Sequence, residues 1–60
     1  MGTLMDYEAA AEYLRTTPRH VRQLWQRREI AAVKVGRLVR FTTEDLDAYV
    51  RAQRQPAIAR

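Results

Sequence analysis

The 60-residue sequence contains no cysteine, serine or asparagine, and His20 is its only histidine. These absences exclude a disulfide framework, a structural zinc cluster, and a catalytic triad built on serine, cysteine or histidine. The apolar runs are far shorter than the roughly 20 residues of a membrane span, and no basic segment precedes an apolar one in the first residues of the sequence. A chain of this length also cannot enclose a large substrate cleft. We therefore expect one soluble, intracellular domain that is not an enzyme, with no metal, cofactor, small-molecule substrate or membrane partner.

The charge of the chain is unevenly distributed. Eleven basic and seven acidic residues give a net charge of +4. Residues 1–14 carry −3, residues 15–43 carry eight basic groups and only Glu29, and residues 44–60 are balanced. Ten of the eleven cations are arginine, which suits bidentate contacts with phosphate or guanine, although a GC-rich coding bias explains the arginine equally well. We expect the middle of the chain to contact a polyanion and residues 44–60 to face away from it.

Two short helices are predicted in the first half of the chain. Asp6 is a good N-cap for a helix over 7–14, whose buried side is expected to contain Met5, Ala10, Tyr13 and Leu14. Thr17 followed by Pro18 predicts the start of a second helix. In that helix Val21, Leu24 and Trp25 cluster on one side and Arg19, Arg22, Gln23 and Gln26 on the other. Two short helices joined by a three-residue turn, the second with outward donors, are typical of a helix-turn-helix.

From Ala32 the apolar period changes to two, which predicts a hairpin. Val33 and Val35 alternate with Lys34, and after Gly36 the valine and phenylalanine at 39 and 41 alternate with an arginine. Glycine at the first loop position favours a two-residue turn with Arg37 at the tip. We expect Lys34 and Arg40 to leave the same outward face, forming a basic wing.

A third helix is predicted after the hairpin. Thr42 and Asp45 have the spacing of a capping box, and Leu46, Tyr49 and Val50 form an apolar stripe that continues to about Gln53. Proline at 56 favours a frayed tail over 55–60. The expected fold is mainly α with a small hairpin, in the order α-α-β-β-α, over a single domain at residues 1–54.

The combined motifs resemble excisionases of the MerR-like winged helix-turn-helix family over about residues 5–50. The stretches that carry the resemblance are A-A-E-Y-L at 10–14, R-H-V-R-Q-L at 19–24, E-I-A-A-V-K-V-G-R at 29–37 and E-D-L-D-A-Y-V at 44–50. Any one of them alone is weak, and the V-K-V-G-R and E-D-L-D-A-Y segments discriminate best. The chain departs from the family pattern at Arg15 and Arg28, where glycines commonly end the two helices.

The resemblance implies that the second helix enters the major groove and that the wing reaches the adjacent minor groove or its phosphates. It also implies a phage or prophage excisionase, a recombination directionality factor that bends attachment-site DNA and directs an integrase towards excision, in an actinobacterial phage. The partners would be double-stranded DNA at attachment-site repeats, the phage integrase and neighbouring protomers on the DNA. The location would be the bacterial cytoplasm, with the nucleoid. The DNA-binding residues would be Thr17, Arg19, His20, Arg22, Gln23, Gln26 and Arg27 in the recognition helix, and Lys34, Arg37 and Arg40 in the wing.

Other interpretations compete with these at individual residues. Trp25 is interpreted as a core residue rather than a base-stacking one because of its helical spacing. His20 fits a phosphate donor and an ordinary surface histidine equally well. Gln23 and Gln26 are interpreted as base readers, although glutamine also suits a solvated helix face, and Arg37 alone would pass for a solvated turn residue.

Two further function classes compete with the excisionase. A small prophage or plasmid transcriptional regulator needs the same helix and wing, and the sequence does not separate it from an excisionase. A protein-interaction module without DNA would leave the +7 of residues 15–43 unexplained.

The charge distribution predicts a strong dependence of DNA binding on salt. If about five of the eight central cations meet phosphates, log K should fall against log salt with a slope of roughly −4 to −5. Binding isotherms at several salt concentrations measure this slope. A flat response would contradict DNA binding.

Overall fold

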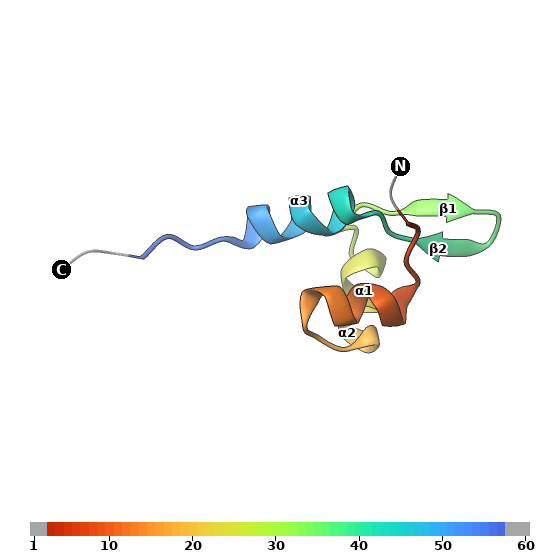
Figure 1. Cartoon of the computed structure of the whole chain (residues 1–60), viewed down its shortest axis with the longest axis horizontal. Coiled ribbons are helices and arrows are strands. Elements are labelled where there is room, and N and C mark those ends of the chain that lie inside the picture. The colour runs from red at the N-terminus through yellow and green to blue at the C-terminus, as the bar shows by residue number, and fades with distance from the viewer. Residues whose placement is uncertain (1–2, 58–60) are drawn as a thin grey trace.

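The computed structural model describes residues 3–57 and contains three helices and one antiparallel hairpin. The elements are α1 (Tyr7–Leu14), α2 (Pro18–Gln26), β1 (Val33–Val35), β2 (Leu38–Arg40) and α3 (Thr43–Gln53). Helices α1 and α2 pack together and α3 lies against α1, while the hairpin and the C-terminal end of α3 project in opposite directions (Figure 1). This is the predicted winged helix-turn-helix, with extents of 50 × 25 × 19 Å.

Helix boundaries follow the predicted caps. Asp6 Oδ1 accepts from the N–H of Ala9 at 2.8 Å, and the Thr17 hydroxyl accepts from the N–H of His20 at 3.2 Å. Thr42 and Asp45 form the reciprocal capping box at the start of α3. Residues 55–57 are exposed and in no helix or strand, and the rest of the predicted tail, 58–60, lies outside the described residues. No helix within residues 3–57 is long and apolar enough to cross a membrane.

The core is small and formed by one apolar cluster. Its buried members are Ala10, Ala11, Val21, Leu24, Ile30, Phe41 and Leu46. The expectation that Tyr13 is buried was wrong: its side chain is 46% exposed. Positions 7, 10, 11 and 14 lie on the inward face of α1 at helical spacing, and Tyr13 falls outside that face. Val50, at the end of the predicted α3 stripe, is also exposed because this part of α3 extends beyond the core.

Both helices of the helix-turn-helix end in the same backbone motif. Arg15 (φ 59°) follows α1, and Arg28 (φ 58°) lies just beyond α2. The N–H of Thr16 donates to the carbonyl of Ala11, and the N–H of Glu29 donates to that of Leu24, each at 2.8 Å. The N–H of Arg15 also donates to the carbonyl of Glu12 at 3.2 Å, and the N–H of Arg28 to that of Trp25 at 2.9 Å. Each pair of hydrogen bonds forms a Schellman motif. Arginine therefore occupies two left-handed positions that favour glycine.

The hairpin register contradicts one expectation about the wing. Lys34 pairs with Val39, and Val33 pairs with Arg40. Directly opposed residues in an antiparallel pair share a face, so Lys34 and Arg40 lie on opposite faces, and the expectation that they share one was wrong. The cause is the two-residue turn itself, because it places position 35 opposite 38. Gly36 at φ 62° supplies the positive dihedral angle that this turn needs.

The side chain of Tyr13 connects α1 to α3. Its hydroxyl donates to Asp47 Oδ1 at 2.7 Å, and this hydrogen bond, with a smaller effect of local burial, raises the pKa of Tyr13 above its ordinary value of 10.0. The charges of Asp47 and Glu44 act in the same direction. The aromatic residue outside the core thus holds the two helices together by a polar contact.

Replacing Arg15 by glycine should stabilise the fold. A non-glycine residue in the left-handed region costs about 1–2 kcal/mol, of which the extra chain entropy of glycine cancels part, so we expect a gain of about 1 kcal/mol. Chemical denaturation measures the difference. The matched control is Glu12→Gly, in the ordinary helical part of α1, which should lose about 1 kcal/mol. A loss of stability in Arg15→Gly would contradict the strain at this position.

The Tyr13–Asp47 hydrogen bond should give the fold a pH-dependent contribution. Because the pKa of Tyr13 is higher in the folded chain than in the unfolded one, this contribution is present below pH 10 and is lost as pH rises through the folded pKa. Asp47→Ala should return the pKa of Tyr13 towards its ordinary value, as measured by NMR titration of the ring. Glu44→Gln should lower it less. An unchanged pKa in Asp47→Ala would refute the assignment.

Candidate nucleic-acid interface

The exposed face of α2 presents side-chain donors and no carboxylate. The sequence of α2 is P-R-H-V-R-Q-L-W-Q, without an acidic residue, and Val21 and Leu24 fix its other side in the core. Arg19, Gln23 and Gln26, with Arg27 directly after the helix, are exposed as the sequence predicted. Guanidinium and amide groups on one helix face can donate to guanine and adenine edges and to phosphates.

Thr17 and Arg22 lie differently from the other predicted members of this face. The hydroxyl of Thr17 already accepts the capping hydrogen bond at the start of α2. The guanidinium of Arg22 lies over the ring of Tyr7, 4.9 Å from the centroid, in a shallow pocket that Asp6 and Glu8 also line. The guanidinium of Arg22 is therefore held against Tyr7, next to the acidic residues Asp6 and Glu8 at the start of α1.

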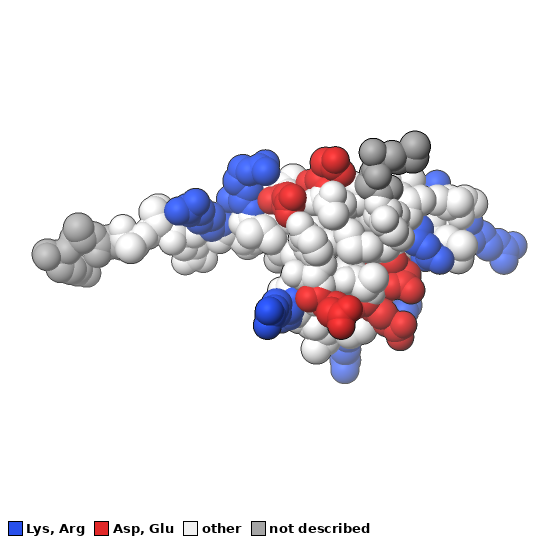
Figure 2. Space-filling model, viewed as in Figure 1, with Lys and Arg blue, Asp and Glu red and all other residues white. Residues whose placement is uncertain are grey.

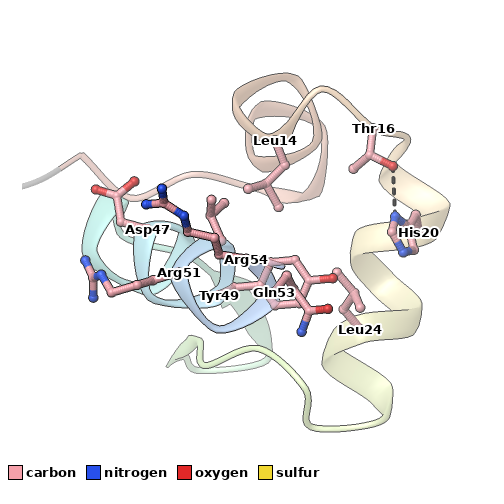
Figure 3. A pocket seen from close by; sticks show the side chains of 10 residues that line it. Leu14, Thr16, His20, Leu24, Asp47, Tyr49, Arg51, Gln53 and Arg54 are labelled. Atoms are coloured by element: carbon pink, nitrogen blue, oxygen red, sulfur yellow. Dashed lines mark hydrogen bonds between the residues drawn. The ribbon is translucent and has the colours of Figure 1, made fainter. Parts of the chain in front are cut away.

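His20 lies on the opposite flank of α2. Its Nδ1 is 2.8 Å from Thr16 Oγ1, a hydrogen bond that orients the ring (Figure 3). Both residues line a groove of about 560 Å³ between the helix-turn-helix and α3, into which Leu14 and Leu24 also project. The ring is thus at the border between the donor face and this groove, and Thr16 constrains it in either role considered from the sequence.

Trp25 and Arg28 form a stacked pair at the end of α2. The guanidinium of Arg28 is 4.0 Å from the centroid of the half-buried Trp25 ring and donates to the Trp25 carbonyl at 2.8 Å. Trp25 packs against the core, so its interpretation as a core residue is confirmed. Arg28 stacks over the ring, next to the Schellman turn that follows α2.

The wing contributes two exposed cations. Arg37 stands beside Gly36 at the tip of the hairpin, and Lys34 lies one strand position inside it. Arg40 is half-buried at the base of the hairpin, where its guanidinium donates to the carbonyl of Val39 at 2.8 Å. The cation closest to the body of the protein is therefore fixed, whereas the two near the tip are presented outward.

The eight central cations thus divide into two groups. Arg22, Arg28 and Arg40 contact a ring or a carbonyl within the protein. The other five are exposed side chains: Arg15, Arg19, Arg27, Lys34 and Arg37. Arg15, which directly follows α1, was not among the residues predicted to bind DNA.

Acidic residues gather on a different part of the surface. In Figure 2 they gather over α1 and the first part of α3, whereas blue side chains lie at the hairpin end, at the far end of α3 and at the outer edges of the helix-turn-helix. This face would repel a polyanion, so the donor face of α2 and the tip of the hairpin form the candidate interface. Within residues 3–57 no group of three or more metal-ligating side chains is close enough to hold a metal ion.

Comparison with known proteins agrees with this geometry. The family model described as a helix-turn-helix domain matches residues 4–54. Searches of curated proteins and of solved structures found no match to this chain. Because the family match covers most of the chain and includes α1, α2, the hairpin and α3, the protein belongs to the helix-turn-helix domain family of DNA-binding folds.

Proposed function

We propose that this protein is an excisionase that binds and bends attachment-site DNA and directs integrase-mediated recombination towards excision. The observation that carries the proposal is the pairing of an acid-free donor face on α2 with a cationic hairpin tip in one helix-turn-helix domain. The resemblance of the wing and third-helix motifs to excisionases supports the recombination role.

Helix α2 acts as the recognition helix in the major groove. An α-helix fits this groove, where each base pair presents a distinct pattern of donors and acceptors. Gln23 and Gln26 are placed one turn apart and are suited to adenine edges, while Arg19 and Arg27 at the two ends meet guanine or phosphate. Arg22, held by Tyr7, serves as a flank contact to the backbone rather than as a base reader.

The hairpin acts as a wing at the adjacent minor groove. The chain contains no acidic residue between Glu29 and Glu44, so every charged residue of the wing is basic. Arg37 at the tip reaches furthest and Lys34 follows it along the strand. These two cations anchor the protein on the phosphates or in the groove and set the register of α2.

Several protomers act together with an integrase. One small domain contacts few base pairs, so useful specificity requires neighbouring protomers on repeated sites. A bend shared along the DNA favours this cooperativity, since smooth bending of a short site costs on the order of 1–6 kcal/mol. A transcriptional regulator would use the same surfaces, and only the recombination experiment below separates the two functions.

Substitutions in α2 and in the wing should have different effects on specificity. Gln23→Ala should cost on the order of 1–3 kcal/mol at the specific site with little change on random duplex, because it removes base contacts. Arg37→Ala should weaken binding to both duplexes together, because it removes a backbone contact. Fluorescence anisotropy with a site obtained by in vitro selection measures both affinities. Gln53→Ala on α3 is the matched control, and equal losses on both duplexes in Gln23→Ala would show that α2 is not the reader.

Addition of the protein should increase excisive recombination. With the integrase of the same genetic element and a plasmid bearing two recombinant attachment sites, we expect a clear increase in excised circles over integrase alone. Arg37→Ala should reduce this increase in parallel with its loss of DNA affinity. An unchanged yield, together with altered activity of a promoter that contains the selected site, would identify a regulator instead.

A further inference from the structure

One face of the wing is mostly apolar and exposed. Val33, Val35 and Leu38 share this face with the half-buried Arg40 at the base of the hairpin, and the three aliphatic residues are 38%, 46% and 53% exposed. Val39, on the other face, packs against the core cluster. A small protein rarely leaves three large aliphatic side chains side by side in water unless they meet a partner.

The charge of the hairpin indicates which partner this face meets. Arg37 stands at the tip beside Leu38, Arg40 shares the face with the aliphatic residues, and Lys34 lies on the opposite face. The nearest acidic residues along the chain are Glu29 and Glu44. A second copy of the hairpin would bring like charges together, and so would any basic surface. A polyanion with an apolar interior satisfies both features, and the minor groove of DNA combines phosphates at its rim with sugar and base edges inside.

The dimensions of the wing determine how it enters this groove. A sheet with side chains on both faces needs about 10 Å of thickness, whereas the minor groove of B-form DNA is only about 6 Å wide. The hairpin therefore does not fit an undeformed groove. Proteins that open the minor groove do so by inserting an apolar side chain between base pairs, which kinks the duplex towards the major groove.

We propose that Leu38 is an apolar wedge that enters a base step from the minor groove and kinks the DNA. Leu38 is the most exposed of the three aliphatic residues and directly follows the tip residue Arg37. Val35, its cross-strand partner, lies beside it on the same face. Arg37 holds the phosphates of the opened groove. This inference rests on the proposed DNA binding and adds to it the residue that deforms the duplex.

The wedge selects flexible DNA at the step that it enters. Pyrimidine–purine steps are the most easily unstacked, so a TA or CA step beside the major-groove site of α2 is the expected place of insertion. Specificity at this step would come from deformability, without a hydrogen bond from the wing to a base edge.

The test uses a duplex selected in vitro with the wild-type protein and labelled with 2-aminopurine at successive steps beside the α2 footprint. Unstacking raises 2-aminopurine fluorescence, so saturating wild-type protein should raise it about threefold or more at one step. Leu38→Ser should abolish most of this rise, and Leu38→Phe, which keeps a large apolar side chain, should retain it. Val50→Ser is the matched control, because Val50 is equally exposed, at 51%, but lies on α3.

Replacing the labelled pyrimidine–purine step by an A-tract provides a second measurement. Wild-type affinity should fall about tenfold, whereas the affinity of Leu38→Ser should change little, because that variant no longer deforms the step. Circular dichroism confirms that each variant is folded, and Gln23→Ala reports site recognition independently of the wedge.

Each outcome of this test supports or overturns the wedge. A full 2-aminopurine rise in Leu38→Ser, or the absence of a rise in the wild type at saturation, overturns it. If Gln23→Ala still loses affinity for the selected site and not for random duplex, DNA recognition by α2 stands even without the wedge. A loss of self-association in Leu38→Ser without a change in fluorescence would assign the apolar face to a second copy. Failure of the wild type to bind any duplex would refute DNA binding itself.

Discussion

The burial of Phe41 is the constraint on which the rest of the structure depends. Its side chain is fully buried and meets the ring of Tyr7 edge-on at 5.7 Å, which ties α1 to the base of the hairpin. Its backbone exchanges two hydrogen bonds of 2.8 Å with Met5, so the segment before α1 extends the hairpin pairing. The next residue, Thr42, begins the capping box of α3. One residue thus fixes where the wing leaves the body, where α3 starts and how α1 is held, and replacing it would disturb all three.

The elements of this fold were predictable because their signals are local. Caps at Asp6, Thr17 and Thr42 and the glycine at position 36 act within a few residues, and each forms the contact expected of it. Contacts between elements were less predictable, because they depend on register and packing. Tyr13 is apolar enough to suggest burial, yet its hydroxyl finds an acceptor on α3 that no local pattern reveals.

The candidate site shows the same division between local and long-range information. That α2 exposes Arg19, Gln23 and Gln26 follows from helical periodicity alone. The position of Arg22 depends instead on a ring supplied by α1, and that of Arg40 on the pairing register of the hairpin. The prediction that Lys34 and Arg40 share a face of the wing was wrong because it considered the alternation within each strand without the cross-strand pairing. Only the pairing decides which residues share a surface, and here it separates two cations and joins three aliphatic residues.

The two parts of the interface are supported very differently. Helix α2 is anchored by Val21 and Leu24 in the core and closed by a Schellman turn, so its donors are presented from a rigid support. The hairpin contributes only Val39 to packing against that core, and otherwise depends on its own cross-strand bonds and on Phe41 at its base. Segments with few buried apolar contacts open at lower free energy than the core. In the proposed complex, a rigid α2 would keep its register on the bases while the lightly supported wing adjusts to the shape of the DNA. The proposal therefore assigns sequence recognition and DNA deformation to separate residues, even in a domain this small.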